Sequence, residues 1–410
     1  MNKKKIIIIS IIVILIIISF LFISLIFTQK PNSTNFVVQI TNLFPNSNAI
    51  NSTLSSKFGN EIDQLSIDRT GSSKSEFNQI TDFSVSDLFL IKDGQSSTTS
   101  DILFFIDKDK GNLYQKTKYE DILKISNQTI LDSKKIIVTN SVDKKYNIYI
   151  KTEVGGVPYF LNTKLSQNLS SSTKQNIIKK LPNYIQDIKP SPLKDSSILL
   201  TTKINDQINL SITDQNLEKQ IKIFSSPYQN WIVDWFSTKN IILSTRPSHK
   251  LQGKAYSLDI QDKSLDPIIK DFYGLTTLTS YSGKYILINY FMNDSIVSGL
   301  YNTESKVLEP NKLLFLTNTC TWSKDPERLY CAVPINTKNL GLYPDDLYKG
   351  KVKTTYQLYS KEPASGAQNF ISLPPNSPEL KKVTLIKVDS SQRTIYLLNS
   401  DKLYQYDLLP

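Results

Sequence analysis

The sequence predicts an all-β ectodomain behind one N-terminal transmembrane helix, and three observations carry that prediction. The chain opens with a long uncharged apolar run, and most of the remainder alternates short strand-like runs with polar turns. A unit made of a polar turn and an apolar strand then recurs, in several places at intervals in the low forties. Because a four-stranded propeller blade has about 40–45 residues, we predict a single β-propeller.

The apolar run extends from Ile6 to Phe27 and follows the lysines at positions 3, 4 and 5. A helix of these 22 residues would span about 33 Å, enough for a hydrocarbon core of about 30 Å. The run is longer than the apolar region of about 7–15 residues in a cleaved signal peptide. The following "FTQKPNST" has no A-x-A-like site, so we expect an uncleaved anchor, with cleavage as the alternative. The positive-inside rule places residues 1–5 in the cytoplasm and the chain after Thr28 outside.

The formal net charge of +11 bears on the partners of the protein. Lysines are spread over the chain, and outside residues 3–5 no basic block marks a nucleic-acid site. The charge favours attraction to anionic lipid heads or wall polymers, although a lysine-rich genome would explain it as well. We expect a bilayer contact through residues 6–27, an envelope protein or anionic wall polymer as partner, and no nucleic acid.

Residues 28–75 differ in amino-acid composition from the rest of the chain. They are rich in Ser, Asn and Thr, as in "PNSNAINSTLSS", which is typical of a stalk or lead-in to the ectodomain. From residue 76 to 410 strand patterns dominate. "INLSIT" alternates apolar and polar residues, and "YILINY" is a nearly continuous apolar run typical of a strand covered on both faces. The best helix candidate is the short segment Ser171–Leu181.

Six copies of the turn-and-strand unit align, and a seventh near Leu88 is weaker. The six strands begin near Ile136, Ile198, Ile241, Tyr285, Leu329 and Thr394. Their spacings are 62, 43, 44, 44 and 65 residues, so two intervals require insertions, one with the helix candidate and one with "LGLYPDDLYKGKVKT". We expect seven blades, with six or eight as alternatives. We expect the last strand, "KLYQYDLLP", to lie in a final blade that a strand from the N-terminal region completes.

Three of the copies share a turn motif. Trp235-Phe236-Ser237, Tyr281-Ser282-Gly283-Lys284 and Trp322-Ser323-Lys324-Asp325 resemble the W-S-P-D-G-K signature of TolB-like and WD-repeat-like β-propellers. "DKGNLYQKT" and "LYPDDLYKG" are similar to segments of membrane-anchored propeller proteins from small-genome, uncultured bacteria. The resemblance covers residues 85–409, but Phe236 departs from Ser and most turns lack Gly, which leaves the blade count open. We expect Trp235, Tyr281 and Trp322 to pack between blades.

The chain carries no recognisable catalytic or cofactor motif. It has no G-x-S-x-G, H-E-x-x-H, P-loop or G-x-G-x-x-G pattern. Its one histidine, His249, lies in a loop with Pro and Lys, where we expect a solvated surface residue. Asp107, Asp109 and Gly111 have D-x-D-x-G spacing, but the intervening lysines oppose a calcium site. We predict a hairpin turn there with Gly111 at positive φ, and no catalytic residue, metal or cofactor.

The segment "LYPDDLYKG" is the candidate contact loop of the ectodomain. It carries Asp345 and Asp346 between Tyr343 and Tyr348. Paired carboxylates can serve acid–base chemistry, but neighbours on a strand or turn point apart, so we assign no catalysis to them. A structured loop is the default interpretation, and the aromatic residues make a contact surface at the rim the functional alternative.

The only two cysteines, Cys320 and Cys331, lie in "NTCTWSKDPERLYCAVP". If residues 323–328 form a hairpin turn, Trp322 faces Leu329 and Cys320 faces Cys331. Opposed residues on antiparallel strands have Cα atoms about 4.5–5.5 Å apart, and a disulfide needs about 4.4–6.8 Å. Because such a bond persists outside the cytoplasm, we predict a disulfide that locks the hairpin register. Two buried free thiols are the alternative.

These observations favour a binding or scaffolding module at the cell envelope, anchored in the cell membrane and not an enzyme. The main alternative is an envelope enzyme that processes glycans or peptides with carboxylates at the propeller channel. A purely structural envelope component is a third interpretation. Inward Asp, Glu and Arg around a deep pocket would favour the enzyme, whereas the fold itself does not decide, because propellers host many functions.

Overall fold

The computed structural model describes residues 76–92, 101–118, 120–126, 129–140, 145–152, 158–164, 178–192, 197–214, 217–293 and 295–408. The predicted tail 1–5, transmembrane helix 6–27 and stalk 28–75 lie outside these residues. Among the helices of the described residues, none has the length and apolar character needed to cross a membrane.

The described residues form six antiparallel sheets, which confirms the predicted all-β class. The first three sheets are numbered outward from their inner strand. They contain β2 (Val85–Lys92), β3 (Asp101–Asp107), β4 (Leu113–Thr117) and β5 (Leu123–Lys124); β6 (Ser133–Asn140), β7 (Lys145–Thr152), β8 (Pro158–Lys164) and β9 (Ile178–Lys180); and β10 (Ile185–Pro190), β11 (Ile198–Ile204), β12 (Gln207–Thr213) and β13 (Ile221–Ser226).

The fourth sheet has seven strands and the last two have four each. The fourth contains β14 (Trp231–Trp235), β15 (Asn240–Thr245), β16 (Gln252–Asp259), β17 (Leu265–Thr279), β18 (Tyr285–Met292), β19 (Ser295–Asn302) and β20 (Val307–Pro310). The fifth contains β21 (Cys320–Trp322), β22 (Leu329–Pro334), β23 (Tyr356–Lys361) and β24 (Gln368–Ile371). The sixth contains β25 (Val383–Val388), β26 (Thr394–Asn399), β27 (Lys402–Asp407) and β1 (Phe77–Gln79).

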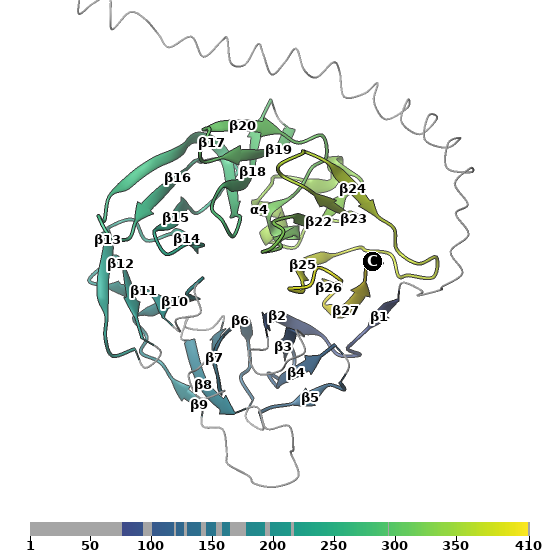
Figure 1. The fold of residues 1–410 in the computed structure, drawn as a ribbon, viewed down its shortest axis with the longest axis horizontal. Helices are drawn as coiled ribbons and strands as arrows, with labels where there is room; N and C mark the ends of the chain where they lie inside the picture. Colours follow the sequence, from purple (N-terminus) through teal and green to yellow (C-terminus); the bar gives the residue numbers. More distant parts are fainter. Residues whose placement is uncertain are drawn as a thin grey trace, which may run out of the picture. The chain divides into compact units, whose positions relative to one another are not determined.

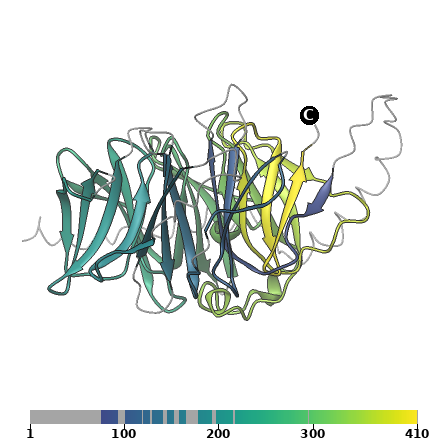
Figure 2. The same cartoon turned by 90° about the horizontal axis from the view of Figure 1, so that it is seen from below.

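The sheets surround a common axis, and β2, β6, β10, β14 and β25 are the strands closest to it (Figure 1). Seen from the side, the strands run between two ends of the ring, where the loops gather (Figure 2). Buried apolar clusters lie between neighbouring sheets, including the last and the first, where Tyr396 and Leu403 join Leu88 and Phe105. Each sheet is apolar on both faces, so stacking on two neighbours in a closed ring buries both. The fold is therefore a β-propeller.

The long strand β17 serves two parts of the seven-stranded sheet. Its residues from Leu265 to Tyr273 pair with β16, and those from Tyr273 to Thr279 pair with β18. The register is irregular near the middle, where Gly274 has φ +63°, a conformation that suits glycine. The sheet therefore consists of two four-stranded portions that share one strand.

The ring is closed by pairing between the start and the end of the described chain. Phe77 faces Tyr406 and Gln79 faces Tyr404 across β1 and β27, which confirms the predicted completion of the last sheet by an N-terminal strand. The Phe77 ring stacks on Tyr404 with centroids 5.2 Å apart. Two distant parts of the sequence are thereby joined in one sheet.

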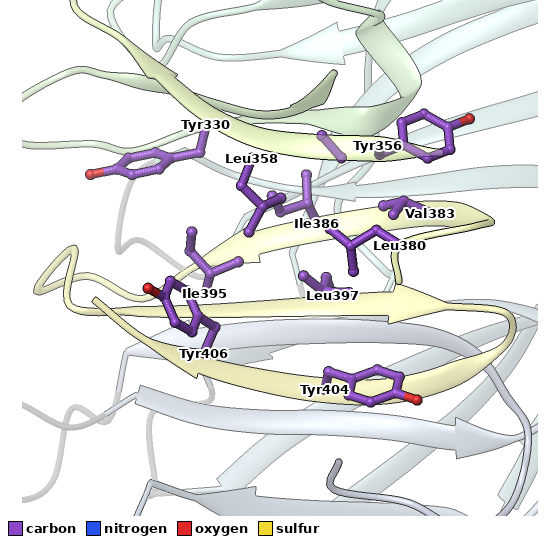
Figure 3. Packing of buried hydrophobic residues seen from close by; sticks show 11 residues of the cluster. Tyr330, Tyr356, Leu358, Leu380, Val383, Ile386, Ile395, Leu397, Tyr404 and Tyr406 are labelled. Carbon is purple, nitrogen blue, oxygen red and sulfur yellow. The ribbon is translucent and has the colours of Figure 1, made fainter. Parts of the chain in front are cut away.

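Packing between the last two sheets shows how the interfaces are built (Figure 3). Leu358 of β23 and Ile386 of β25 point toward one another, and Ile395 and Leu397 of β26 extend the same buried cluster. Tyrosines such as Tyr330 lie at the cluster edge, where the Tyr330 hydroxyl reaches Gln392 at 3.0 Å. The rings fill the interface, and the hydroxyls of Tyr330, Tyr404 and Tyr406 are hydrogen bonded.

Two sequence expectations about the elements need correction. Five of the seven repeat copies lead into the second strand of a sheet or sheet portion. The copies at Leu88 and Ile136 lie instead in the inner strands β2 and β6, so their alignment with the other five was wrong by one strand. Inner and second strands are both covered on two faces and carry the same apolar pattern. The end of the helix candidate, Ile178–Lys180, is strand β9, and residues 171–177 lie outside the described residues. The second predicted insertion is present as residues 335–355, between β22 and β23.

Candidate functional site

Two sets of loops meet at one end of the strands: the loops between the second and third strands of each sheet, and the links from one sheet to the next. Backbone hydrogen bonds join them, from Lys203 N to Tyr184 O at 2.7 Å and from Arg246 N to Asn230 O at 3.0 Å. The 335–355 insertion belongs to this end because it connects β22 and β23. We call this end the insertion face. The other end, with the turns 236–239, 280–284, 323–328 and 389–393, is the opposite face.

Most of the large apolar side chains that the described residues expose lie at the insertion face. Their exposed fractions range from 38% at Tyr228 to 61% at Leu131. They are Leu131, Tyr184, Ile204, Tyr228, Ile232, Leu251, Tyr273, Ile335, Leu342 and Tyr348. A gathering of exposed apolar groups on one face is typical of an interaction surface, whereas singly scattered ones need no explanation.

The 335–355 insertion folds into two short helices, η2 (Thr337–Leu340) and α4 (Asp345–Tyr348). The Asn336 side chain accepts a hydrogen bond from Lys338 N and caps the first. Leu340 and Tyr343 are each 1% exposed and pack on Leu316. The insertion is thus a structured element with a small core of its own.

A buried hydrogen-bond cluster attaches the insertion to the ring. The Asn289 carbonyl oxygen accepts from Thr317 N at 2.8 Å and from the Tyr343 hydroxyl at 3.1 Å, and its amide donates to Phe315 O at 2.7 Å. Thr276 lies 3.0 Å from the same hydroxyl. Burial raises the pKa of Tyr343, so the phenol stays protonated and can donate. The predicted contact residue Tyr343 is therefore an internal anchor.

A second attachment joins the insertion to the loop after β15. The Asp345 carboxylate accepts from His249 N at 2.6 Å and from the Ser248 hydroxyl at 3.3 Å. Asp346 accepts from Leu342 N at 2.9 Å within the insertion. Both carboxylates of the predicted contact loop thus bind the protein's own backbone.

His249 is half-buried, which corrects the expectation of a solvated surface residue. Its ring packs edge-on against Phe291 with centroids 4.5 Å apart. Its contacts come from Phe291 at the end of β18 and from Asp345 of the insertion, which accepts from its backbone amide. The sequence around "TRPSHK" does not indicate these long-range contacts.

Tyr348 is the exposed member of the predicted contact loop, at 58%. It lines a groove of about 570 Å³ together with Arg246, Trp231, Lys203 and Lys151. These residues come from the second, third and fourth sheets and from the insertion of the fifth, so the groove exists only in the folded ring. Its volume falls within the range of about 300–1,000 Å³ found for ligand sites.

Positive charge dominates the groove. Arg246 is exposed, and no described residue forms an ion pair with its guanidinium. Lys203 pairs with Asp206 at 3.4 Å, but that carboxylate is 85% exposed, so the pair is weak. The acidic group of the lining, Asp187, already faces Lys135 at 3.5 Å. Arg246 and Tyr348 line the same groove; burial of the Tyr348 hydroxyl raises its pKa, and the charge of Arg246 opposes that rise.

Charged side chains from inner strands also gather around the ring axis. They are Asp87, Lys135, Asp187, Lys189, Asp234 and Lys387. The carboxylates contact neighbouring inner strands. Asp87 accepts from Ile136 N of β6 at 2.9 Å, and Asp234 accepts from Thr279 N of β17 at 3.1 Å. Asp187 lies 3.5 Å from Lys135 of β6. Burial raises the pKa of Asp87 to about 6, against the opposing effects of the Ile136 amide and the charge of Lys387. Burial also lowers the pKa of Lys135 to about 8.

The three aromatic residues of the turn motif differ in their surroundings. Trp322 is 4% exposed and donates to Leu278 O at 3.2 Å, and Trp235 packs partly buried between the third and fourth sheets, as expected for both. Tyr281 is 50% exposed, so its predicted packing between blades was wrong. It lies in the turn beyond the end of β17. Partial burial of its hydroxyl, together with the charges of Asp234 and Asp101, raises the pKa of the phenol.

The predicted turn after β3 is confirmed. Asp107 accepts from Asp109 N and Lys110 N, both at 2.9 Å, and Gly111 has φ +67°. The described residues contain no group of three or more His, Cys, Asp or Glu side chains arranged to hold a metal ion.

The cysteine hairpin has the predicted register, with Cys320 opposite Cys331 and Trp322 opposite Leu329. The structure joins the two cysteines in a disulfide with Cα atoms 4.1 Å apart. The bond lies in the apolar cluster between the fourth and fifth sheets, next to Leu287 and Phe315. It therefore connects the short inner strand β21 to its sheet.

Sequence reasoning missed the groove and the axial charges. For the axis a signal existed, because Asp87 and Asp234 interrupt the apolar strands "VSDLFLIK" and "WIVDW". For the groove there was none, because Lys151, Arg246 and Tyr348 are separated by roughly a hundred residues each and obey no common spacing.

Neither a protein-family model nor a curated protein matches the sequence. Among solved structures, an oligogalacturonate lyase in complex with manganese is similar at 8% identity and a TM-score of 0.49, over 82% of this chain and 99% of that chain. The WD40 domain of SCAP from fission yeast is similar at 10% identity and 0.45, over 82% and 98%. The Dos1 propeller is similar at 13% identity and 0.44, over 79% and 78%. These likenesses include enzymes and scaffolds alike and do not bear on function, so the β-propeller assignment rests on the closed ring of sheets.

Proposed function

We propose that the protein is a membrane-anchored, extracytoplasmic β-propeller that binds a partner at the cell envelope through its insertion face. The observation that supports this most is that most of the large apolar side chains exposed by the described residues lie at that face, since a concentration of exposed apolar groups on one face is typical of an interaction surface. The uncharged run 6–27 behind three lysines supports the anchor and its orientation. A positive net charge of +11 is compatible with anionic envelope components.

We also propose that the propeller has seven blades. Because β17 pairs with β16 in its first part and with β18 in its second, the seven-stranded sheet supplies two four-stranded blades. The other five sheets supply one each.

Affinity capture from envelope extracts tests the binding face. The full chain in detergent is compared with a Leu251→Asp/Ile335→Asp variant of the insertion face, and with a Tyr281→Asp/Val307→Asp variant away from it. All four side chains are at least half exposed, so the changes should not disturb folding. We expect the first variant to lose partners that the wild type and the control retain. Equal capture by all three would refute the assignment of this face.

Protease accessibility tests the topology. Protease added to spheroplasts should remove most of the protein if Pro410 and the ectodomain are external, and leave residues 1–5 protected. An ectodomain that is fully protected until the membrane is dissolved would reject the proposed orientation.

An envelope enzyme that processes glycans or peptides is the second candidate, and the axial charges favour it. Asp87 and Lys135 have pKa values moved toward neutrality from opposite sides, as is common for acid–base pairs. Turnover of cell-wall glycan or peptide fragments by the wild type, abolished in Asp87→Asn, would support the enzyme over the binding module.

A further inference from the structure

We propose that the groove between the third and fourth sheets binds an acidic polypeptide segment that carries apolar side chains. This segment would belong to the envelope partner, so its binding rests on the proposed function of the insertion face. The groove is lined by Arg246, Lys203, Lys151, Trp231 and Tyr348, of which Lys203, Arg246 and Tyr348 lie at the insertion face.

The cationic residues provide the charge complementarity. Arg246 carries an exposed guanidinium without an ion pair among the described residues, and Lys151 contributes a further positive charge near Asp187. Because Asp187 faces Lys135 at 3.5 Å, the lining leaves cationic groups uncompensated. An arginine side chain can bind a carboxylate through two parallel hydrogen bonds. An acidic occupant is therefore favoured.

The aromatic residues provide a preformed apolar wall. Edge-on contacts hold the Trp231 ring against Tyr228, Phe224 and Tyr256, with centroids 5.0, 6.0 and 5.8 Å apart. Asp345 and Tyr343 fix the short helix that ends at Tyr348. Trp, Tyr and Arg are the residue types most enriched among the side chains that dominate protein interfaces. Ordering costs on binding are small when such side chains are already held in place.

The exposed apolar side chains of the groove favour a polypeptide over an anionic wall polymer as the occupant. Ile232 is 41% exposed and Tyr348 is 58% exposed beside the cations. A polyphosphate would satisfy the cations but leave these surfaces in water. A segment with alternating acidic and aliphatic or aromatic side chains would cover both.

Fluorescence anisotropy with the full chain in detergent tests the inference. The probes are a fluorescein-labelled peptide of alternating Glu and Leu or Tyr, the same peptide with Gln for Glu, and the same peptide with Gly for Leu and Tyr. Unlabelled long-chain polyphosphate serves as competitor. We expect the acidic apolar peptide to bind in a salt-dependent manner, and the other two peptides to bind at least about tenfold more weakly.

Matched variants assign the binding to the groove. Arg246→Ala and Tyr348→Ala should each weaken binding about tenfold, whereas Arg393→Ala, an exposed arginine of the opposite face, should not. Equal affinity for the Glu and Gln peptides, or wild-type affinity in Arg246→Ala, would overturn the inference. Equal affinity for the Gly peptide together with displacement by polyphosphate would overturn it in favour of a wall polymer. If capture depends on Leu251 and Ile335 but not on Arg246, the binding face stands and the groove assignment fails.

Discussion

The Asp345 carboxylate accepts a hydrogen bond of 2.6 Å from the backbone amide of His249, 96 positions earlier in the sequence. This contact joins an insertion of the fifth sheet to a loop of the fourth. It places the helix that ends at Tyr348 beside the groove that contains Arg246. A loop that the sequence suggests as a contact surface is in this way a positioning element, with one exposed aromatic side chain.

Asp345→Ala should loosen the insertion. A hydrogen bond to a charged group contributes about 1.5–3 kcal/mol to stability, and the amide of His249 loses its partner. We expect faster amide hydrogen exchange within residues 335–355 and weaker binding of the acidic peptide. Asp345→Asn should recover part of both, because its carbonyl oxygen still accepts. The control is Asp266→Ala, which removes an exposed carboxylate on β17 that has no hydrogen bond among the described residues. If amide exchange within residues 335–355 were as fast in this control as in Asp345→Ala, the prediction would be contradicted.

Tyr343→Phe should lower the free energy of unfolding by about 1–3 kcal/mol, because Asn289 and Thr276 lose a buried partner. Urea unfolding measures the loss. Tyr359→Phe is the matched control, since the Tyr359 hydroxyl bonds to Gln357 in an exposed position. Equal stability of the two variants would show that the buried cluster does not hold the insertion.

Cys320 and Cys331 should be disulfide-bonded in protein isolated from the envelope. Mass spectrometry of non-reduced peptides should find the two cysteines linked, and two alkylatable thiols would contradict the prediction. The Cys320→Ala/Cys331→Ala variant should be less stable by about 3 kcal/mol or less, because the closed loop is short. Reductant should lower the melting temperature of the wild type and leave that of the variant unchanged.

Phe77→Ala should weaken ring closure. Phe77 is partly buried and packs on Tyr404 and Tyr406, so its truncation should cost about 1–3 kcal/mol. Phe370→Ala changes a 55% exposed phenylalanine of the outer strand β24 and should cost much less. Removal of residues 404–410 should cost several kcal/mol, since single large core truncations already cost about 2–5. A truncated protein that melts like the intact one would reject a closed ring.

Stability should fall as the pH rises through the pKa of Asp87. Burial raises that pKa from its ordinary 3.8 to about 6 in the folded state, so the folded protein binds this proton more tightly than the unfolded chain does. The resulting stabilisation is complete below about pH 4 and is lost as the pH rises through about 6; it amounts to at most about 3 kcal/mol. Asp87→Asn keeps an acceptor for Ile136 N and should lack this loss.

Urea midpoints between pH 4 and 8 measure the effect. The wild type should lose stability relative to Asp87→Asn over that interval, whereas Asp266→Asn should follow the wild type. A constant difference between the wild type and Asp87→Asn at every pH would mean that Asp87 titrates as an ordinary surface carboxyl.

Features that depend on short stretches of sequence were predictable. The hairpin register of Cys320 and Cys331 follows from counting across one turn, and the Asp107 turn follows from its glycine at positive φ. Alternating and continuous apolar runs indicated strands, because a strand repeats every two residues and an inner strand is covered on both faces. The same local signal could not separate β6 from β7, since each has a run of three buried apolar residues, Ile136–Val138 in β6 and Ile148–Ile150 in β7.

What the sequence by itself determined is therefore the all-β class, a turn-and-strand unit that is in phase in five of its seven copies, the completion of the last sheet by an N-terminal strand, and the cysteine register. Only the tertiary structure decided which side chains share a surface. Tyr343 and His249 are covered because of elements far away in the chain, and Tyr281 is half exposed although its turn motif matches that of the buried Trp322. The groove of Arg246 and Tyr348 arises from the curvature of the ring and from two long-range hydrogen-bond attachments of one insertion. Contacts of this kind form between residues that are far apart in the chain and close together only after folding. They therefore produce no regular residue spacing that could be recognised in the sequence.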